Sequence, residues 1–543
     1  MDSRTRKRIL SCIRKYTIGH KWFHLCFIIV GLFGIMIVLF SKPEKSSNPI
    51  AAVGNNLGNF AIKILIIVFW SLLYCVSFIW LIYKEEFNRN IVYDVWHYKQ
   101  TPFYLISFFM KSDPNKLDCS KLYKEDWHNA KGIMFGYSED DYLVKYDSGT
   151  EMNCAVFGSP GSGKTVSMVK PNARCFGGSV LAVDIKGDIY EYNKRYRRII
   201  RFVPDIPNAI QKSAHFNPFE GFAKLNKTEL KLRVSNMAEI LIPLDSQKEP
   251  YFSVTARKMF TGFLLYLLEV CKSLTFPEFL HAVLHNKRPA GYKPDFFPSN
   301  IFEWIECVVD SRIPAACEQV VGLIGNNERN VSGCYDRLNT ALIPFSNPTL
   351  DVLLSGKGKC ISAKNLYDGY DIYLQISQSN LSVYAPLFTL IINSFFISFS
   401  NRPDTAFNQH TNRPILCILD EYPRLTFSYE TIDSFLSTLR SKSVVMMLVC
   451  QSAAQLVKKY GDDGAQALLG NCTYQVCCKA NDEITRNHFV QTIGTKRTLK
   501  ESFESTETEE PVYPPSKYGN LTDTAIVYLD GKHAELRKIK CYQ

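Results

Sequence analysis

The sequence predicts an α/β protein in which a mostly parallel sheet holds an inserted all-helical domain and follows two transmembrane helices. After residue 150, short apolar segments alternate with helical stretches, which is typical of a parallel sheet with helices on both faces. Between residues 222 and 345 the strand-like segments disappear, and helix-start patterns at Asn226 and Thr275 indicate helices instead. Two long apolar runs lie within the first 90 residues.

These two apolar runs, 22–40 and 64–83, contain no charged residue. Each has about the 20 residues needed to cross a bilayer. Residues 1–21 hold seven basic side chains against one acid, and Lys84 and Arg89 follow the second run. Because basic residues favour the cytoplasmic side, we expect a multi-pass protein with both termini in the cytoplasm and a short periplasmic loop. The alternatives are a buried core helix or, for the first run, a signal peptide, which the absence of a cleavage site disfavours.

The expected domains follow from these segments. They are a basic cytoplasmic N-terminus at 1–21, a membrane part at 22–90, a nucleotide-binding domain at 91–221 and 346–543, and an all-helical insertion at 222–345. The formal net charge is +11, but residues 1–21 supply +6 of it. The charge is therefore largely a membrane-topology signal and does not by itself indicate nucleic-acid binding. The 17 cysteines show no C-x-x-C pair or metal-ligand spacing, which favours reduced thiols.

A glycine-rich loop follows the apolar strand expected at 154–157 and precedes a helix. It has the pattern G-x-x-x-x-G-K-T, and its residues are Gly158, Ser159, Pro160, Gly161, Ser162, Gly163, Lys164 and Thr165. In such a loop the backbone N–H groups surround phosphates, the lysine contacts the outer phosphates and the hydroxyl binds Mg²⁺. The sequence therefore predicts a P-loop NTPase with ATP and Mg²⁺ as cofactors.

Two acids, Asp420 and Glu421, end the apolar strand expected at 415–419. We expect Asp420 to hold Mg²⁺ through water and Glu421 to polarise the attacking water, although strand-end acids are often simply solvated. The next apolar strand ends in Gln451, where RecA-like motors place a sensor of the γ-phosphate; an ordinary strand-end amide is the alternative. Arg440 precedes that strand and can point into a neighbouring subunit's nucleotide, although a lone arginine at a helix end is usually a surface cation.

Three other patterns are expected to have no catalytic role. His281 and His285 lie four residues apart, but Ala282 stands where a zinc hydrolase has its glutamate. We therefore expect ordinary helix histidines. Residues 356–359, Gly-Lys-Gly-Lys, have no strand before them and are expected to form a basic turn. Residues 500–518 are charged and rich in proline, and are expected to form a loop.

The order of these pieces resembles the TraG/VirD-type coupling proteins of conjugation and type IV secretion. After two N-terminal spans and the glycine-rich loop come Asp184-Ile-Lys186-Gly187-Asp188, His215-Phe-Asn217-Pro218, a helical insertion, the Asp420-Glu421 strand and Gln451-Ser452. The loop pattern alone is generic, whereas the ordered set is specific and covers nearly the whole chain.

The resemblance implies a RecA-like P-loop NTPase motor, typically a homo-hexamer, at the bacterial inner membrane beside the type IV secretion ATPases and inner-membrane channel proteins. It also implies that Gln451 is the sensor, that Arg440 is a trans-acting finger, and that the helical insertion faces the substrate. Asp188 departs from the glutamate usual in the family. The chain ends at Gln543 directly after the last expected core strand, so we expect no C-terminal extension for recruiting protein substrates.

We therefore expect a membrane-anchored ATPase that pumps DNA, or a nucleoprotein or protein effector, into a type IV secretion channel. Single-stranded DNA or a relaxase–DNA complex, with adaptor proteins, are the expected partners. One alternative is an FtsK/HerA-like translocase of double-stranded DNA, which the helical insertion and the absence of a C-terminal DNA-reading module disfavour. The other is a nucleotide-switched membrane scaffold, which Glu421 disfavours because a pure switch needs no hydrolytic base.

Overall fold

The computed structural model describes residues 115–119, 122, 124–146, 152–244, 250–404, 412–499 and 507–542. The chain divides into two units, Met1–Pro114 and Asn115–Gln543, and every described residue belongs to the second. The predicted basic N-terminus at 1–21 and the two predicted spans, 22–40 and 64–83, lie outside the described residues.

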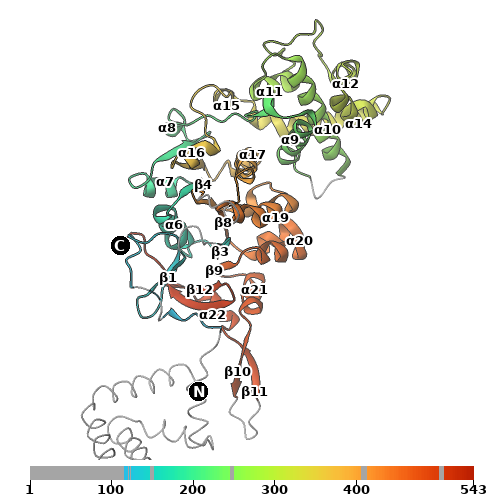
Figure 1. The fold of residues 1–543 in the computed structure, drawn as a ribbon. Helices are drawn as coiled ribbons and strands as arrows, with labels where there is room; N and C mark the ends of the chain where they lie inside the picture. The colour runs from blue at the N-terminus through green and yellow to red at the C-terminus, as the bar shows by residue number, and fades with distance from the viewer. Residues whose placement is uncertain are drawn as a thin grey trace, which may run out of the picture. The chain divides into compact units, whose positions relative to one another are not determined.

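An eleven-stranded sheet with the order β2-β1-β13-β12-β9-β3-β8-β7-β4-β6-β5 organises the second unit (Figure 1). Its strands from β9 to β5 are parallel. They are β9 Tyr474–Lys479, β3 Cys154–Gly158, β8 Val444–Cys450, β7 Ile415–Leu419, β4 Ser179–Ile185, β6 Asp371–Ile376 and β5 Ile199–Phe202. The prediction of a mostly parallel sheet is confirmed.

Four antiparallel strands extend the sheet beyond β9. They are β12 Thr524–Leu529, β13 Lys532–Arg537, β1 Ile133–Tyr137 and β2 Leu143–Tyr146. A separate two-stranded ribbon pairs β10 Thr495–Leu499 with β11 Glu507–Pro511, and a short helix, α22 Pro515–Gly519, follows. The prediction of a loop over 500–518 is therefore wrong in part. Lys496 lies opposite Glu510, and such cross-strand pairs of opposite charge favour a ribbon.

Helices cover both faces of the sheet. Successive strand residues point to opposite sides, and apolar residues on each side need helices to pack against. Val156 and Val180 pack with a helical turn, Thr165–Val169, and with α6 Lys170–Cys175 and α7 Asp188–Asn193. Phe157 belongs to the core on the other face. The helices on that face are α17 Leu381–Ser400, α19 Tyr429–Thr438, α20 Ala453–Gly470 and α21 Glu483–Ile493.

Helix α17 is the one helix among the described residues that has the length and apolar composition of a membrane span. Most of its apolar window is buried within the protein. Phe388 and Phe396 are fully buried in the same core as the strands, so its composition reflects packing inside this unit.

The chain between β5 and β6 is helical throughout its regular elements (Figure 1). These helices are α8 Pro207–Ile210, α9 Lys227–Leu241, α10 Pro250–Val270, α11 Phe276–His285, α12 Ile301–Asp310, α13 Pro314–Val320, α14 Glu328–Leu342, α15 Pro348–Leu353 and α16 Ala363–Tyr367. Asn226 and Thr275 form the expected capping boxes at the starts of α9 and α11. Phe263 packs against Trp304 in the buried interior of this bundle.

Candidate nucleotide-binding site

The glycine-rich loop lies at the carboxyl end of β3 and turns directly into a helix. Gly161 and Gly163 have φ angles of 75° and 83°, a left-handed conformation that glycine adopts most easily. The side-chain oxygens of Ser159 and Ser162 are buried without a hydrogen-bond partner. The loop therefore contains polar groups that its own fold does not satisfy.

A cavity of about 430 Å³ opens above this loop. Its walls include residues 159–166 and the carboxyl ends of β4, β7 and β8. The residues at those strand ends that line the cavity are Ile185, Lys186, Asp420, Glu421 and Gln451. The fold thus brings the predicted loop, the two predicted acids and the predicted sensor to one place.

The strand order explains how three of these side chains meet. Because β8 lies between β3 and β7, Gln451 at its end lies close to both the glycine-rich loop after β3 and Glu421 after β7. The Gln451 amide donates to both carboxylate oxygens of Glu421, at 2.9 and 3.0 Å. Lys164 Nζ lies 3.4 Å from Glu421 Oε1 and donates to the Gly158 carbonyl at 3.3 Å. The carboxylate is thereby held between an ammonium group and an amide.

Asp420 and Glu421 differ in their environment although they are adjacent. Asp420 is 8% exposed, and its burial together with the neighbouring charge of Glu421 raises its pKa to about 6. Glu421 has a φ angle of 50°, an unusual backbone conformation for a residue other than glycine. This turn directs its carboxylate towards Gln451 and Lys164, while Asp420 accepts a hydrogen bond from the Glu421 N–H at 3.1 Å.

Asp184 and Gln375 form a buried support beside the cavity that we did not predict as part of the site. Asp184 accepts hydrogen bonds from the N–H groups of Ile189 and Tyr190 at the start of α7, at 3.0 and 2.8 Å. Gln375 donates to Asp184 at 3.1 Å, and burial raises the pKa of Asp184 to about 6. Ile189 lines the cavity, so this acid fixes one wall. Its place at the end of an apolar strand, like that of Asp420, is the signal that points to it.

Arg424 is another cavity residue that the sequence analysis missed. It follows Glu421 by three residues and is exposed at the cavity mouth. Among the described residues, its guanidinium has no hydrogen-bond or ion-pair partner. A free cation beside a phosphate-binding loop is available for an anionic group, and the short Glu-Tyr-Pro-Arg turn is the pattern that places it there.

A family model for type IV secretory system conjugative DNA transfer matches residues 115–517 of the chain. The chain belongs to this family. The protein VirD4 of Agrobacterium fabrum is 21% identical over 453 residues, which cover 77% of this chain and 63% of VirD4. The conjugal transfer protein TraG of Escherichia coli is 20% identical over 400 residues, covering 68% of this chain and 60% of TraG. The chain thus spans about three fifths of the length of these two relatives.

Two solved structures share the fold of this family member. The unbound conjugative coupling protein TrwBdeltaN70 aligns with a TM-score of 0.57 at 16% identity, covering 77% of this chain and 90% of that one. The plasmid coupling protein TrwB in complex with ADP and Mg²⁺ aligns with a TM-score of 0.56 at 15% identity, covering 75% and 88%. Both likenesses support the mixed α/β fold with its large parallel sheet.

Arg440 of this family member lies away from its own cavity. It belongs to the short helical turn Leu439–Lys442, which precedes β8, whereas Gln451 follows β8. The seven residues of β8 separate them by roughly 20 Å at about 3.3 Å per residue. Arg440 is exposed, and its guanidinium contacts the Met152 sulfur at 3.3 Å. Arg440 thus lies at the amino end of β8, whereas the glycine-rich loop lies at the carboxyl end of the neighbouring strand β3.

The segment after Glu421 is fixed to α20 by buried polar contacts. The Tyr422 and Tyr460 hydroxyls are 2.7 Å apart, and Tyr460 donates to the Phe427 carbonyl at 3.2 Å. Lys459 Nζ donates to the Pro423 carbonyl at 3.3 Å and to the Leu425 carbonyl. Burial lowers the pKa of Lys459 to about 8. Helix α20 therefore determines where the turn carrying Glu421 lies.

His281 and His285 have ordinary partners in this structure. His281 Nε2 lies 2.9 Å from Asp351, and His285 Nε2 lies 3.1 Å from the Ser346 hydroxyl. Across the described part of the chain, no three His, Cys, Asp or Glu residues are grouped to hold a metal ion.

Proposed function

We propose that the protein is a membrane-anchored ATPase that recruits DNA, as a single strand or bound to a relaxase, and pumps it into a type IV secretion channel. The observation that carries this proposal is the arrangement of Lys164, Gln451 and Glu421 around one cavity, with Asp420 beside them. A glutamate held by a sensor amide next to the phosphate-binding lysine suits hydrolysis. Membership of the conjugative DNA transfer family supports DNA as the substrate.

The site fits ATP and Mg²⁺. The left-handed Gly161 and Gly163 leave backbone N–H groups free to face phosphates, and the unsatisfied hydroxyls of Ser159 and Ser162 lie in the same loop. The Thr165 hydroxyl would bind Mg²⁺ and Asp420 would hold it through water, and the ion would neutralise charge on the phosphates. TrwB, with the same fold, was solved with ADP and Mg²⁺.

Each residue around the cavity has a separate role in the proposed ATP hydrolysis. Glu421 accepts a proton from the attacking water, and Gln451 orients the Glu421 carboxylate through its two hydrogen bonds. Lys164 contacts Glu421 in this structure and exchanges that partner for phosphate oxygens when nucleotide binds. Asp184 holds the opposite wall in place through the first turn of α7.

The assembly follows from the same proposal. Because Arg440 cannot reach its own cavity, we assign it as the finger that completes the site of a neighbouring subunit in a homo-hexamer. The predicted spans at 22–40 and 64–83 support a membrane anchor with both termini cytoplasmic, and membership of the family supports the bacterial inner membrane as its location. The proposed motor consists of a nucleotide-binding domain at 91–221 and 346–543 and a helical insertion at 222–345. Partners are the secretion ATPases, the inner-membrane channel proteins and adaptors.

Two substitutions test the chemistry. Lys164→Ala should abolish ATP binding because it removes the cation that contacts the phosphates. Glu421→Gln should keep ATP binding but slow hydrolysis about 10²–10⁴-fold, the usual contribution of a general base. Turnover is measured on the full-length protein in nanodiscs, with and without single-stranded DNA, and binding with a fluorescent ATP analogue.

The outcomes separate the candidate functions. A scaffold that uses nucleotide only as a switch would bind ATP without turnover in the unchanged protein. A double-stranded DNA translocase would be stimulated by duplex but not by single-stranded DNA. Normal turnover in Glu421→Gln would show that Glu421 is not the base.

A further inference from the structure

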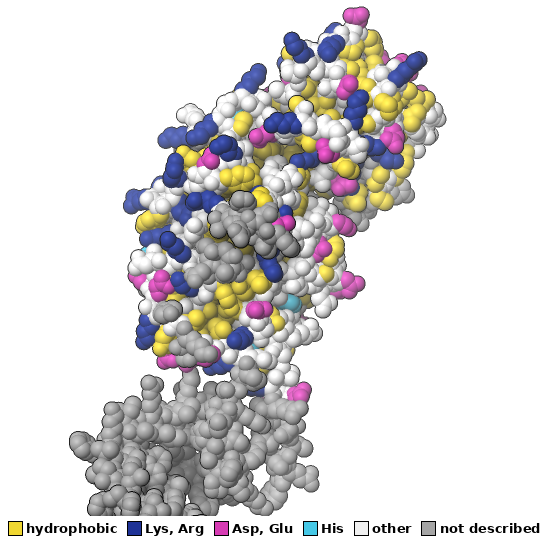
Figure 2. Space-filling model, viewed as in Figure 1, with side chains coloured by type: hydrophobic (Ala, Val, Ile, Leu, Met, Phe, Trp, Pro, Cys, Tyr) yellow, Lys and Arg dark blue, Asp and Glu magenta, His cyan; other side chains and the backbone are white. Residues whose placement is uncertain are grey.

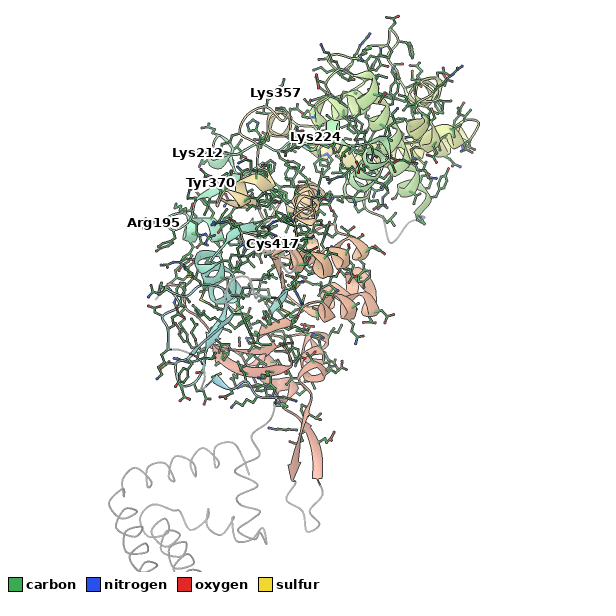
Figure 3. All side chains as sticks on the ribbon, in the orientation of Figure 1. Arg195, Lys212, Lys224, Lys357, Tyr370 and Cys417 are labelled. Carbon is green, nitrogen blue, oxygen red and sulfur yellow. The ribbon has the colours of Figure 1, made fainter. Side chains whose placement is uncertain are left out.

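Positive charge is concentrated along the β5 edge of the sheet. Residues 194–227 contain eight Lys or Arg and two acids, a formal charge of +6. Residues 1–21 supply another +6 of the chain's +11, so all remaining residues together carry a formal charge of −1. Figure 2 shows Lys and Arg gathered along this side, and Figure 3 places Arg195, Lys212 and Lys357 there.

Adjacent backbone segments assemble what we term the basic surface. It consists of Arg198, Arg201, Lys212, Lys357 and Lys359. The Ala214 N–H donates to the Arg201 carbonyl at 2.7 Å, and the His215 N–H donates to the Lys359 carbonyl at 2.9 Å. Among the described residues, none of the five cations is in an ion pair, whereas the nearby Arg197 is paired with Asp371. The surface is therefore uncompensated positive charge.

The loop Gly356-Lys357-Gly358-Lys359 is shaped to present its two lysines. Gly356 and Gly358 have φ angles of 72° and 107°. A Cβ at Gly356 would lie 3.0 Å from Asn217 Cγ, and one at Gly358 would lie 3.0 Å from His215 Cε1. Glycine therefore lets the loop backbone press against residues 215–217 while Lys357 and Lys359 stay exposed. The predicted basic turn has a fixed backbone and two free cations.

A cation–aromatic pair lies within the basic surface. The Arg198 guanidinium is 4.1 Å from the centre of the Tyr370 ring and donates to its hydroxyl at 2.5 Å. Lys359 Nζ is 6.0 Å from the same centre. Arg198 is exposed, so its guanidinium is accessible to a ligand. Guanidinium planes stack on unpaired nucleic-acid bases, whereas bases inside a duplex are not accessible to them.

We propose that the basic surface binds the backbone of single-stranded DNA, with Arg198 and Tyr370 as a stacking platform for a base. This inference rests on the proposed function in taking DNA as the polymer that is moved. Unpaired cations attract a polyanion by releasing its counterions, and the cation–aromatic pair distinguishes a single strand from duplex or from a lipid surface.

Hydrogen bonds connect the basic surface to the nucleotide cavity. Arg201 Nη1 donates to Gln375 Oε1 at 3.3 Å, and Gln375 Nε2 donates to Asp184 at 3.1 Å. Asp184 in turn holds Ile189 of the cavity wall. The Arg201 guanidinium also lies 4.1 Å from the centre of the Tyr190 ring, and Tyr190 is the next residue along α7. A DNA strand that ATP hydrolysis moves needs such a connection between its binding surface and the nucleotide cavity. An incidentally bound anion does not.

Salt-dependent binding tests the proposal. The full-length protein in phosphatidylcholine nanodiscs is titrated with fluorescent oligothymidylate at several salt concentrations. The double variant Lys357→Gln/Lys359→Gln should bind more weakly and lower the slope of log affinity against log salt by about 1.4, since each phosphate contact to a single strand contributes about 0.7. Lys357→Arg/Lys359→Arg should keep the wild-type slope. Tyr370→Leu should weaken binding without changing the slope.

The matched control is Lys131→Gln/Lys532→Gln, which removes two exposed lysines from the other end of the sheet and should bind as wild type. ATP hydrolysis without DNA should be equal in all variants. A wild-type slope in Lys357→Gln/Lys359→Gln, or an equal loss in the control, would overturn the proposal. It is also overturned if that variant keeps oligothymidylate binding but loses binding to phosphatidylglycerol vesicles. Failure of the proposed function looks different: wild type binds the oligonucleotide, yet its ATP hydrolysis is not stimulated.

Discussion

Gln451 determines how the Glu421 carboxylate is held. Its amide donates to both oxygens of Glu421, so the carboxylate cannot rotate freely even though Lys164 contacts only one of those oxygens. If Gln451 and Glu421 have the proposed roles of sensor and general base, this contact would link recognition of the γ-phosphate to activation of water. The same contact explains why a strand-end glutamine, which looks ordinary in sequence, has a defined orientation.

Replacing Gln451 by leucine therefore should lower kcat about 10–100-fold while ATP affinity changes little, because the loop and Lys164 remain. Steady-state hydrolysis and binding of a fluorescent ATP analogue separate the two effects. Gln466→Leu, at an exposed position of α20, is the matched control and should behave as wild type. An unchanged kcat in Gln451→Leu would remove Gln451 from the mechanism.

At the scale of elements, α20 positions the turn after β7. Lys459 and Tyr460 reach from this helix to residues 422–427, and the helix bends at Gly461, where φ is 76°. Helix α20 also begins just after Gln451. One element therefore connects Gln451 with the turn that follows Glu421, and a displacement of α20 would alter both.

The contribution of Lys459 to the stability of the protein should depend on pH. Burial lowers its pKa to about 8 in the folded protein, below the value of about 10.4 in an unfolded chain. Between these values the unfolded state binds more protons, so the stability of wild type relative to Lys459→Met should rise from pH 8 to pH 10. Urea unfolding at several pH values, followed by tryptophan fluorescence, measures the difference. A difference that is constant or falls with pH would contradict the assigned pKa.

Much of the site could be predicted from sequence because its residues lie in short local patterns. The loop 158–165 and the Asp420–Glu421 pair each follow an apolar strand, and the fold brings them together as expected. Strand order could not be predicted: β3 pairs with β8 and β9, which lie roughly three hundred residues further along the chain, and only tertiary packing selects these neighbours. Arg424 and Asp184 were missed for the same reason, since only the folded structure places Arg424 at the cavity mouth and Asp184 behind the cavity wall.

At the scale of the whole molecule, the proposed role of Arg440 implies that one subunit would lack a complete site. Its cavity opens at the carboxyl ends of the parallel strands, whereas Arg440 is exposed at the amino end of β8. A ring of identical subunits can bring these two edges together, because a head-to-tail interface joins different surfaces of the same chain. Hydrolysis would then depend on assembly.

Mixing inactive variants tests this dependence. Arg440→Ala should keep ATP binding but lose stimulation by single-stranded DNA, since a trans arginine contributes about 10³–10⁵ in rate. Mixed with Glu421→Gln, it should regain some activity, because a mixed interface can pair an intact Glu421 with an intact Arg440. Arg440→Lys, which keeps the charge but not the fork of donors, serves as the comparison. Absence of rescue at every mixing ratio would place the finger elsewhere.

The edge strand β5 has a further consequence for solubility. An exposed strand edge can pair with another chain, and proteins limit this with short strands, charged residues or covering segments. Strand β5 has four residues, includes Arg201 and follows Arg198, and the segment at Ala214 hydrogen-bonds to its end. The cations that we assign to DNA thus also discourage strand-to-strand aggregation. Apolar replacements at Arg198 and Arg201 should make the protein precipitate, whereas glutamine replacements should leave it soluble.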